Sequence, residues 1–174
     1  MGVASMYVAS QAQMRAGTAG YEFVATQNFA ANTITFSGLS GTYLYDILVE
    51  ATNGGGAGPA ISIYANGDTT ITNYYRQLIR ANNATITTTR ANQAVLCAGN
   101  ASDKTYVKIQ CFRDTNSGFF CAQAVSNQAQ GASLNNDTGI VCSTADIAAN
   151  ISSLTISADN PLTGKATLYR TYIG

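Results

Sequence analysis

The chain has 174 residues, a formal net charge of zero at pH 7 and a charged fraction of only 10%. This length suits one domain with a real core, and the hydrophobic fraction of 46% argues against disorder. The balanced charge gives no electrostatic reason to expect nucleic acid or an anionic membrane as a partner, and no apolar run approaches the ~20 residues of a membrane span. Histidine is absent, which excludes a Ser-His-Asp triad.

The first 20 residues differ from the rest of the chain. They are rich in Ala, Gln, Ser and Met and show no alternation of apolar and polar side chains. We interpret residues 1–20 as an N-terminal arm and residues 21–174 as one β-sandwich domain. In an assembled particle such an arm lies along a neighbouring subunit, whereas in a monomer it frays, and the sequence leaves both open. If the arm does bind a neighbour, Met6, Tyr7 and Met14 are the residues that we expect at the interface.

Short alternating segments follow, separated by Gly, Asn, Asp and Ser. In the clearest, Thr42–Thr52, one face carries apolar side chains and the other carries Asp46 and Glu50. We expect eight to ten strands, no helix longer than two turns and an all-β antiparallel sandwich, preferably a jelly roll of eight strands. The candidate segments are Tyr21–Thr26, Thr33–Phe36, Thr42–Thr52, Ala60–Ala65, Tyr74–Arg80, Ala84–Thr89, Ala94–Ala98, Thr105–Asp114, Gly118–Val125, Gly139–Cys142, Ser152–Ser157 and Ala166–Ile173.

The acidic residues give little support for catalysis. Apart from Asp46 and Glu50, most sit in turn contexts, such as Asp68 in Asn66-Gly-Asp and Asp137 in Asn136-Asp-Thr-Gly, where hydrogen bonds of a turn explain an Asp. Asp46 and Glu50 are four strand residues apart, roughly 13 Å, which is too far for the carboxylate pair of a glycosidase. We predict no catalytic residue. The enzymatic alternative is a carbohydrate-active enzyme that uses Asp46, Glu50 or Asp114.

Metal, cofactor and phosphate sites are not predicted either. The glycine-rich loop 53–59 lacks the Lys-Ser/Thr end of a phosphate-binding loop, and the oxygen-rich segments 66–68 and 135–137 do not match a calcium loop. The four cysteines include no C-x-x-C pair and have no histidine to complete a zinc site. We interpret them mainly as small buried residues on strands, with disulfides as an open alternative. They are Cys97, Cys111, Cys121 and Cys142.

The low charge and the ten tyrosines favour association with other subunits, because little charge repulsion opposes contact and a tyrosine ring is apolar with a polar tip. Tyr74 and Tyr75 are neighbours on a predicted strand, so they must point to opposite faces. We therefore expect one of the two at an interface or a sheet edge.

Five short stretches carry a family resemblance. They are Phe36–Glu50, Ala60–Asp68 with its Ala-Asn-Gly-Asp end, the Asn-Tyr-Tyr of Asn73–Tyr75, the closing Ile151–Ile156 and Gly164–Tyr169. In these stretches residues 34–173 resemble a group of tailed-bacteriophage virion proteins that contain a β-sandwich module. The chain departs from the group near Leu162, where members often carry Phe, and at Arg170, where they carry Gly.

The resemblance implies a non-enzymatic structural protein that is made in the host cytoplasm and resides in the virion. We expect a homotrimeric capsid decoration or minor head protein whose partners are the major capsid protein and other virion proteins. The alternative is a receptor-binding module of a head or tail fibre, with a host-surface polysaccharide as partner. Neither role implies a cofactor, a metal, nucleic acid or a membrane.

Overall fold

The computed structural model describes residues 20–29, 31–54, 59–82, 85–98, 104–114, 118–130, 133–146 and 150–173. Met6, Tyr7 and Met14 of the expected arm lie outside the described residues. The elements are β1 (Glu22–Asn28), β2 (Thr33–Ser37), β3 (Tyr43–Asn53), β4 (Ala60–Ala65), the 3-10 helix η1 (Ile71–Asn73), β5 (Tyr74–Asn82), β6 (Thr85–Ala91), β7 (Val95–Ala98), β8 (Lys104–Arg113), β9 (Phe119–Gln130), β10 (Ser133–Asp146), β11 (Ser153–Ala158) and β12 (Leu162–Tyr172).

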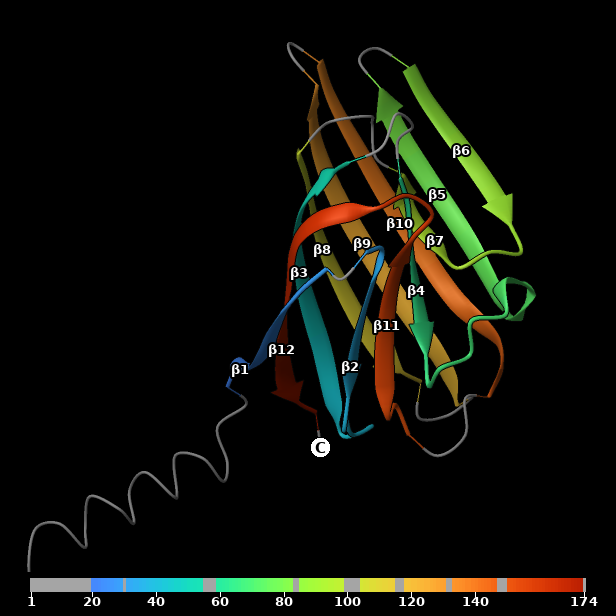
Figure 1. Cartoon of the computed structure of the whole chain (residues 1–174). Helices are drawn as coiled ribbons and strands as arrows, with labels where there is room; N and C mark the ends of the chain where they lie inside the picture. The colour runs from blue at the N-terminus through green and yellow to red at the C-terminus, as the bar shows by residue number, and fades with distance from the viewer. Residues whose placement is uncertain are drawn as a thin grey trace, which may run out of the picture.

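The strands form two antiparallel sheets that pack against each other (Figure 1). The large sheet has the order β1-β12-β3-β8-β9-β10-β5-β6 and the small sheet β2-β11-β4-β7. The pairs β1·β12, β2·β11, β3·β8 and β4·β7 are nested in the sequence and alternate between the sheets, which is how a jelly roll is wound. The β5–β6 and β9–β10 hairpins extend the large sheet. The prediction of an all-β, jelly-roll-like antiparallel sandwich is confirmed.

The expected number of eight to ten strands is too low, since the described residues form twelve. Each of the twelve candidate segments overlaps one of these strands. The additional strands lie at the edges of the large sheet, where few side chains are buried. In β1 and β6 almost every side chain is exposed or half-buried, so the apolar periodicity that identifies a central strand is weak there. Backbone hydrogen bonds to β12 hold β1 in the sheet, and backbone hydrogen bonds to β5 hold β6.

The core lies between the sheets and follows the period-two pattern of β3. Tyr45, Ile47 and Val49 are at most 1% exposed, as the alternation predicts. Ile61 and Ile63 of β4 reach the same cluster from the small sheet. Fully burying a side chain of this size contributes roughly 1.5–3 kcal/mol, so these facing rows supply much of the stability.

A close approach of β10 to β7 corrects one sequence expectation. A Cβ at Gly139 would overlap the backbone carbonyl of Leu96, so only glycine fits where the two strands meet. Asp137, for which a turn was expected, lies two residues before this glycine in the interior of β10. Asp137 is accordingly not a turn residue, and the turn interpretation at this position was wrong. By contrast, Asn66 and Gly67 have φ of 55° and 75°, which confirms the turn between β4 and η1.

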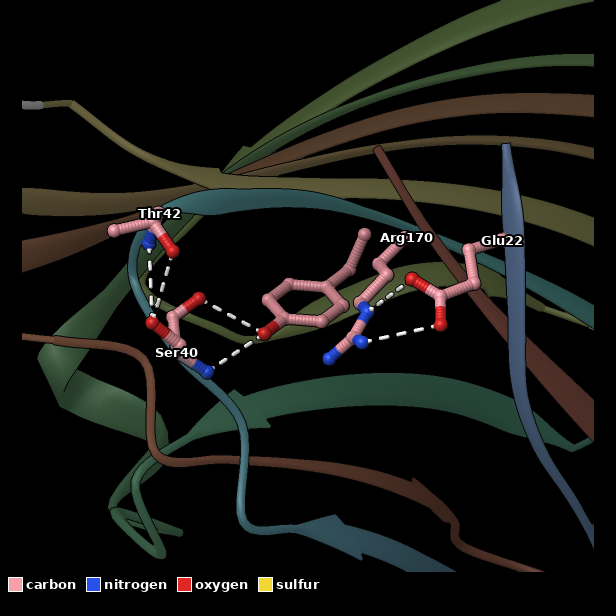
Figure 2. A network of polar contacts seen from close by, with 5 residues as sticks. Glu22, Ser40, Thr42 and Arg170 are labelled. Atoms are coloured by element: carbon pink, nitrogen blue, oxygen red, sulfur yellow. Dashed lines mark hydrogen bonds and ion pairs between the residues drawn. The ribbon is translucent and has the colours of Figure 1, made fainter. Parts of the chain in front are cut away.

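Polar contacts of β1, β12 and the loop before β3 stabilise one end of the sandwich (Figure 2). Arg170 of β12 donates two hydrogen bonds to the Glu22 carboxylate on β1, at 3.0 and 3.2 Å, and this pairing raises the pKa of Arg170. In the loop before β3, the hydroxyls of Ser40 and Thr42 lie 3.0 Å apart. The Tyr45 hydroxyl accepts from the Ser40 N–H at 2.7 Å and donates to the Ser40 carbonyl at 2.8 Å. These bonds tie the loop to the core.

Candidate functional site

Of the three acidic residues considered for catalysis, Asp46 and Glu50 have side-chain partners in the sheet. The Asp46 side chain is 6% exposed on β3, where its Oδ1 lies 3.8 Å from Lys108 Nζ and accepts from the Gln110 amide at 3.4 Å. Glu50 lies 3.4 Å from Lys165 Nζ on β12. The Asp114 backbone closes the turn between β8 and β9 through hydrogen bonds with residues 118 and 119. Such cross-strand pairs are typical of a sheet surface.

Two kinds of site have no counterpart in the described part of the chain. No group of three or more His, Cys, Asp or Glu side chains lies together there as metal ligands would. Within the same residues, no helix is long and apolar enough to cross a membrane.

The four cysteines fall into two pairs with different surroundings. Cys97 and Cys111 are fully buried, as expected, and burial raises the pKa of Cys97 to about 12. Cys121 of β9 and Cys142 of β10 are half-buried and directly opposite each other, with their Sγ atoms 3.1 Å apart. Burial, as the larger cause, and the hydrogen bond to Cys142 together raise the pKa of Cys121 to about 12. The prediction of small buried residues on strands is confirmed in full only for the first pair.

The outer surface of the large sheet exposes an unusual number of apolar side chains. We call the following set the outer apolar face: Tyr75, Ile79, Ile86, Tyr106, Phe112, Phe119, Val125 and Ile140, each 37–73% exposed. It spreads over the adjacent strands β8, β9, β10, β5 and β6. Tyr75 is 56% exposed on this face whereas Tyr74 is 1% exposed in the core, so the two point to opposite sides as predicted.

The strand register orders this face into rows. One row runs across four strands as Phe112, Cys121, Cys142 and Tyr75. On β9, β10, β5 and β6, Arg90 is the only charged residue among the outward-pointing side chains that the structure describes. Contiguous exposed apolar side chains with few charges among them mark contact surfaces for other proteins.

A second surface is a groove of about 540 Å³ between the inner side of the β5–β6 hairpin and β4. We call it the arginine groove. Polar side chains dominate its wall, and the residues are Ala60, Ser62, Tyr64, Ile71, Arg76, Leu78, Arg80, Thr87, Thr89, Gln93, Val95, Ser157, Ala158 and Asp159. Because Arg76 and Arg80 alternate with Tyr75 and Ile79 along β5, the groove and the outer apolar face lie on opposite sides of one strand.

The two arginines of the groove differ in their pairing. Arg80 Nε and Nη2 each donate to the Asp137 carboxylate at 3.0 Å, and this fork raises the pKa of Arg80. In the described part of the chain no acidic side chain pairs with Arg76, and its buried Nε has no hydrogen-bond partner. Burial, together with the neighbouring Arg80 charge, lowers the pKa of Arg76. Arg76 is therefore the incompletely satisfied cation of the groove.

The sequence reasoning did not identify the arginine groove. A signal was present, because positions 76, 78 and 80 share the strand face of Tyr74 and are thus directed inward. That parity places two arginines on a core-facing side, which is unusual unless they are paired or serve a ligand.

Comparisons of this chain with protein-family models, with curated proteins and with solved structures return no match.

Proposed function

We propose that this chain is a non-enzymatic structural protein of a tailed-phage virion, a capsid decoration or minor head protein that docks on the capsid through its outer apolar face. The observation that carries the proposal is that face. The resemblance of residues 34–173 to phage virion modules supports the particle assignment. The cross-strand partners of Asp46 and Glu50 agree with a role without catalysis.

The energetics of docking fit the composition of the face. Burying one large apolar side chain contributes roughly 1.5–3 kcal/mol, and a few well-packed aromatic residues dominate a typical interface. Tyr75, Tyr106 and Phe112 supply aromatic anchors. Lys108 and Gln110 lie between Tyr106 and Phe112 on β8, and neutral Gln and Thr side chains accompany the apolar residues on β9, β10, β5 and β6. The partner that we propose is the major capsid protein. The charges among the described side chains of this face are few, namely Lys104 and Lys108 on β8 and Arg90 on β6, and Lys108 lies beside Asp46, so attachment should depend only weakly on salt.

A pair of matched variants tests the docking surface. Ile140→Asp places a charge in the centre of the outer apolar face, whereas Ser37→Asp places the same charge on an exposed strand position of the small sheet. Wild-type protein and the Ser37 variant should co-sediment with capsids stripped of this chain, and the Ile140 variant should remain in the supernatant. The thermal transition of each variant confirms that it is folded. Equal binding of both variants would then show that the outer apolar face is not the docking surface.

The proposal includes a homotrimer and an N-terminal arm that lies along a neighbour. Deleting residues 1–20 should abolish capsid binding and leave the thermal transition of the sandwich unchanged. Analytical ultracentrifugation should give three times the chain mass of 18.2 kDa. Retained binding of the shortened chain would argue against the arm, and a monomeric mass would argue against the trimer.

The arginine groove favours a second candidate role, that of a receptor-binding module of a head or tail fibre. A groove of this volume lies within the range of about 300–1,000 Å³ that small-ligand sites occupy. Its hydroxyl-bearing wall is suited to hydrogen bonds with a polysaccharide. A glycan array with the full chain distinguishes the roles, because only a receptor-binding module requires affinity for host-surface sugars.

A further inference from the structure

We infer that the arginine groove binds a saccharide that bears a carboxylate, such as a uronic or sialic acid unit, with Arg76 as the residue that holds the carboxylate. The inference deepens the second candidate role above and rests on it. It is compatible with docking through the outer apolar face, since a partner on that face leaves the other side of β5 open.

The first step concerns charge. A partly buried cation is costly when nothing pairs with it, and Arg76 has no acidic partner in the described part of the chain. Asp137, the carboxylate nearest in register to this side of β5, is held by Arg80 at 3.0 Å. The Arg76 Nε is buried and has no hydrogen-bond partner among the residues that the structure describes. A planar guanidinium matches a carboxylate with two parallel hydrogen bonds, so a ligand carboxylate supplies both charge and acceptors.

The second step concerns where the anion lies. Asp159 also lines the groove, and it would repel a carboxylate. Its Oδ1 accepts from the Ala60 N–H at 2.7 Å, which places it at the beginning of β4. The Arg76 side of β5 lies at the other end of β4, where the Tyr74 and Tyr64 rings are 5.6 Å apart. The groove is thus positive at one end and acidic at the other, and the carboxylate belongs at the Arg76 end.

The third step concerns the rest of the ligand. Between these ends the wall presents the hydroxyls of Ser62, Thr87, Thr89 and Ser157 and the amide of Gln93. Each hydroxyl both donates and accepts, as a sugar hydroxyl does, so the two kinds of group can pair without leaving a buried polar atom unsatisfied. An apolar ligand would bury these groups at a cost, and a compact anion such as phosphate would fill only a small part of 540 Å³. An acidic sugar unit joined to one or two neutral sugar units can place its carboxylate at Arg76 and its hydroxyl groups against the polar wall.

Titration calorimetry with the full chain tests the inference. The ligands are a panel of uronic and sialic acid oligosaccharides, each beside the same oligosaccharide with its carboxylates methyl-esterified. Arg76→Gln removes the charge and keeps much of the length of the side chain. Arg90→Gln is the matched control, because Arg90 is exposed on the outer surface of β6. Losing one charge-assisted bidentate pair should weaken binding about tenfold to a hundredfold.

The expected result is that one or more acidic members bind, that esterification and Arg76→Gln each weaken them by this factor, and that Arg90→Gln changes binding by less than about twofold. Binding of acids and esters alike, unaffected at Arg76, would overturn the inference and leave the receptor-binding role standing. Failure of every acidic and neutral glycan would overturn both. Binding of an acidic peptide, polyglutamate, in place of the saccharides would overturn the saccharide assignment. Unchanged thermal transitions of both variants establish that a loss of binding is not a loss of fold.

Discussion

Oxidation of the Cys121–Cys142 pair is the perturbation that the structure specifies most closely. The two residues are directly opposite on β9 and β10, where opposed Cα atoms are about 4.5–5.5 Å apart, within the range that a disulfide spans. Their Sγ atoms are already 3.1 Å apart. Glutathione disulfide should therefore oxidise both thiols to one protein disulfide, with the two hydrogens transferred to two molecules of reduced glutathione.

The size of the effect follows from the 21-residue separation of the two cysteines. The chain-entropy relation for a loop of this length gives about 3 kcal/mol of added stability in the oxidised protein. For a chain of this size that corresponds to roughly 6–12 °C in Tm. Because the pKa of Cys121 is raised to about 12, the thiolate is scarce near neutral pH. The rate of oxidation should thus rise about tenfold per pH unit in the mildly alkaline range.

Thiol titration in denaturant, together with the Tm, measures the outcome. Free thiols should fall from four to two and stop there, since Cys97 and Cys111 are completely buried in the folded protein. The variant Cys121→Ser cannot form the protein disulfide: Cys142 can exchange only into a mixed disulfide with glutathione, releasing one reduced glutathione, and the Tm should not rise. Loss of the Cys97 and Cys111 thiols before those of Cys121 and Cys142, or an oxidised protein with an unchanged Tm, would refute the reasoning.

Two further predictions concern stability, each measured as the free energy of unfolding in urea. Gly139→Ala should cost about 3 kcal/mol, the upper part of the overpacking range, because the added methyl meets the backbone of β7 and not a movable side chain. Gly54→Ala, whose methyl would meet only ordinary contact, should cost less than about 0.5 kcal/mol, and equal costs would contradict the close approach of the strands. Tyr45→Phe should cost about 1–2 kcal/mol, because the Ser40 N–H and carbonyl lose a buried partner; no loss would mean that water replaces the hydroxyl.

Much of the fold was predictable because it depends on local alternation. The period-two pattern of β3 identifies Tyr45, Ile47 and Val49 as core residues without any knowledge of the opposing sheet. The same parity separates Tyr74 from Tyr75. At Asn66 and Gly67 the turn follows from residues that accept positive φ.

What the sequence did not reveal depends on partners that are distant along the chain. Asp137 follows Asn136 and comes two residues before Gly139, which predicts a turn, yet it lies in β10 because Arg80 on β5 neutralises it and β7 packs against Gly139. The arginine groove likewise depends on contacts between segments that are distant along the chain. Parity directs Arg76 inward, but only the path of the β5–β6 hairpin beside β4 determines that it lines a groove and not the apolar core.

The central claim is that this chain is a capsid surface protein, and its copy number in the particle tests that claim most directly. Quantitative mass spectrometry of virus particles purified from cells that produce this chain would scale it to the major capsid protein. A symmetric lattice repeats its surface many times, so the account predicts on the order of hundreds of copies per particle. A dozen or a few dozen copies would contradict decoration and favour a fibre or tail-tip position, and none would contradict the virion assignment itself.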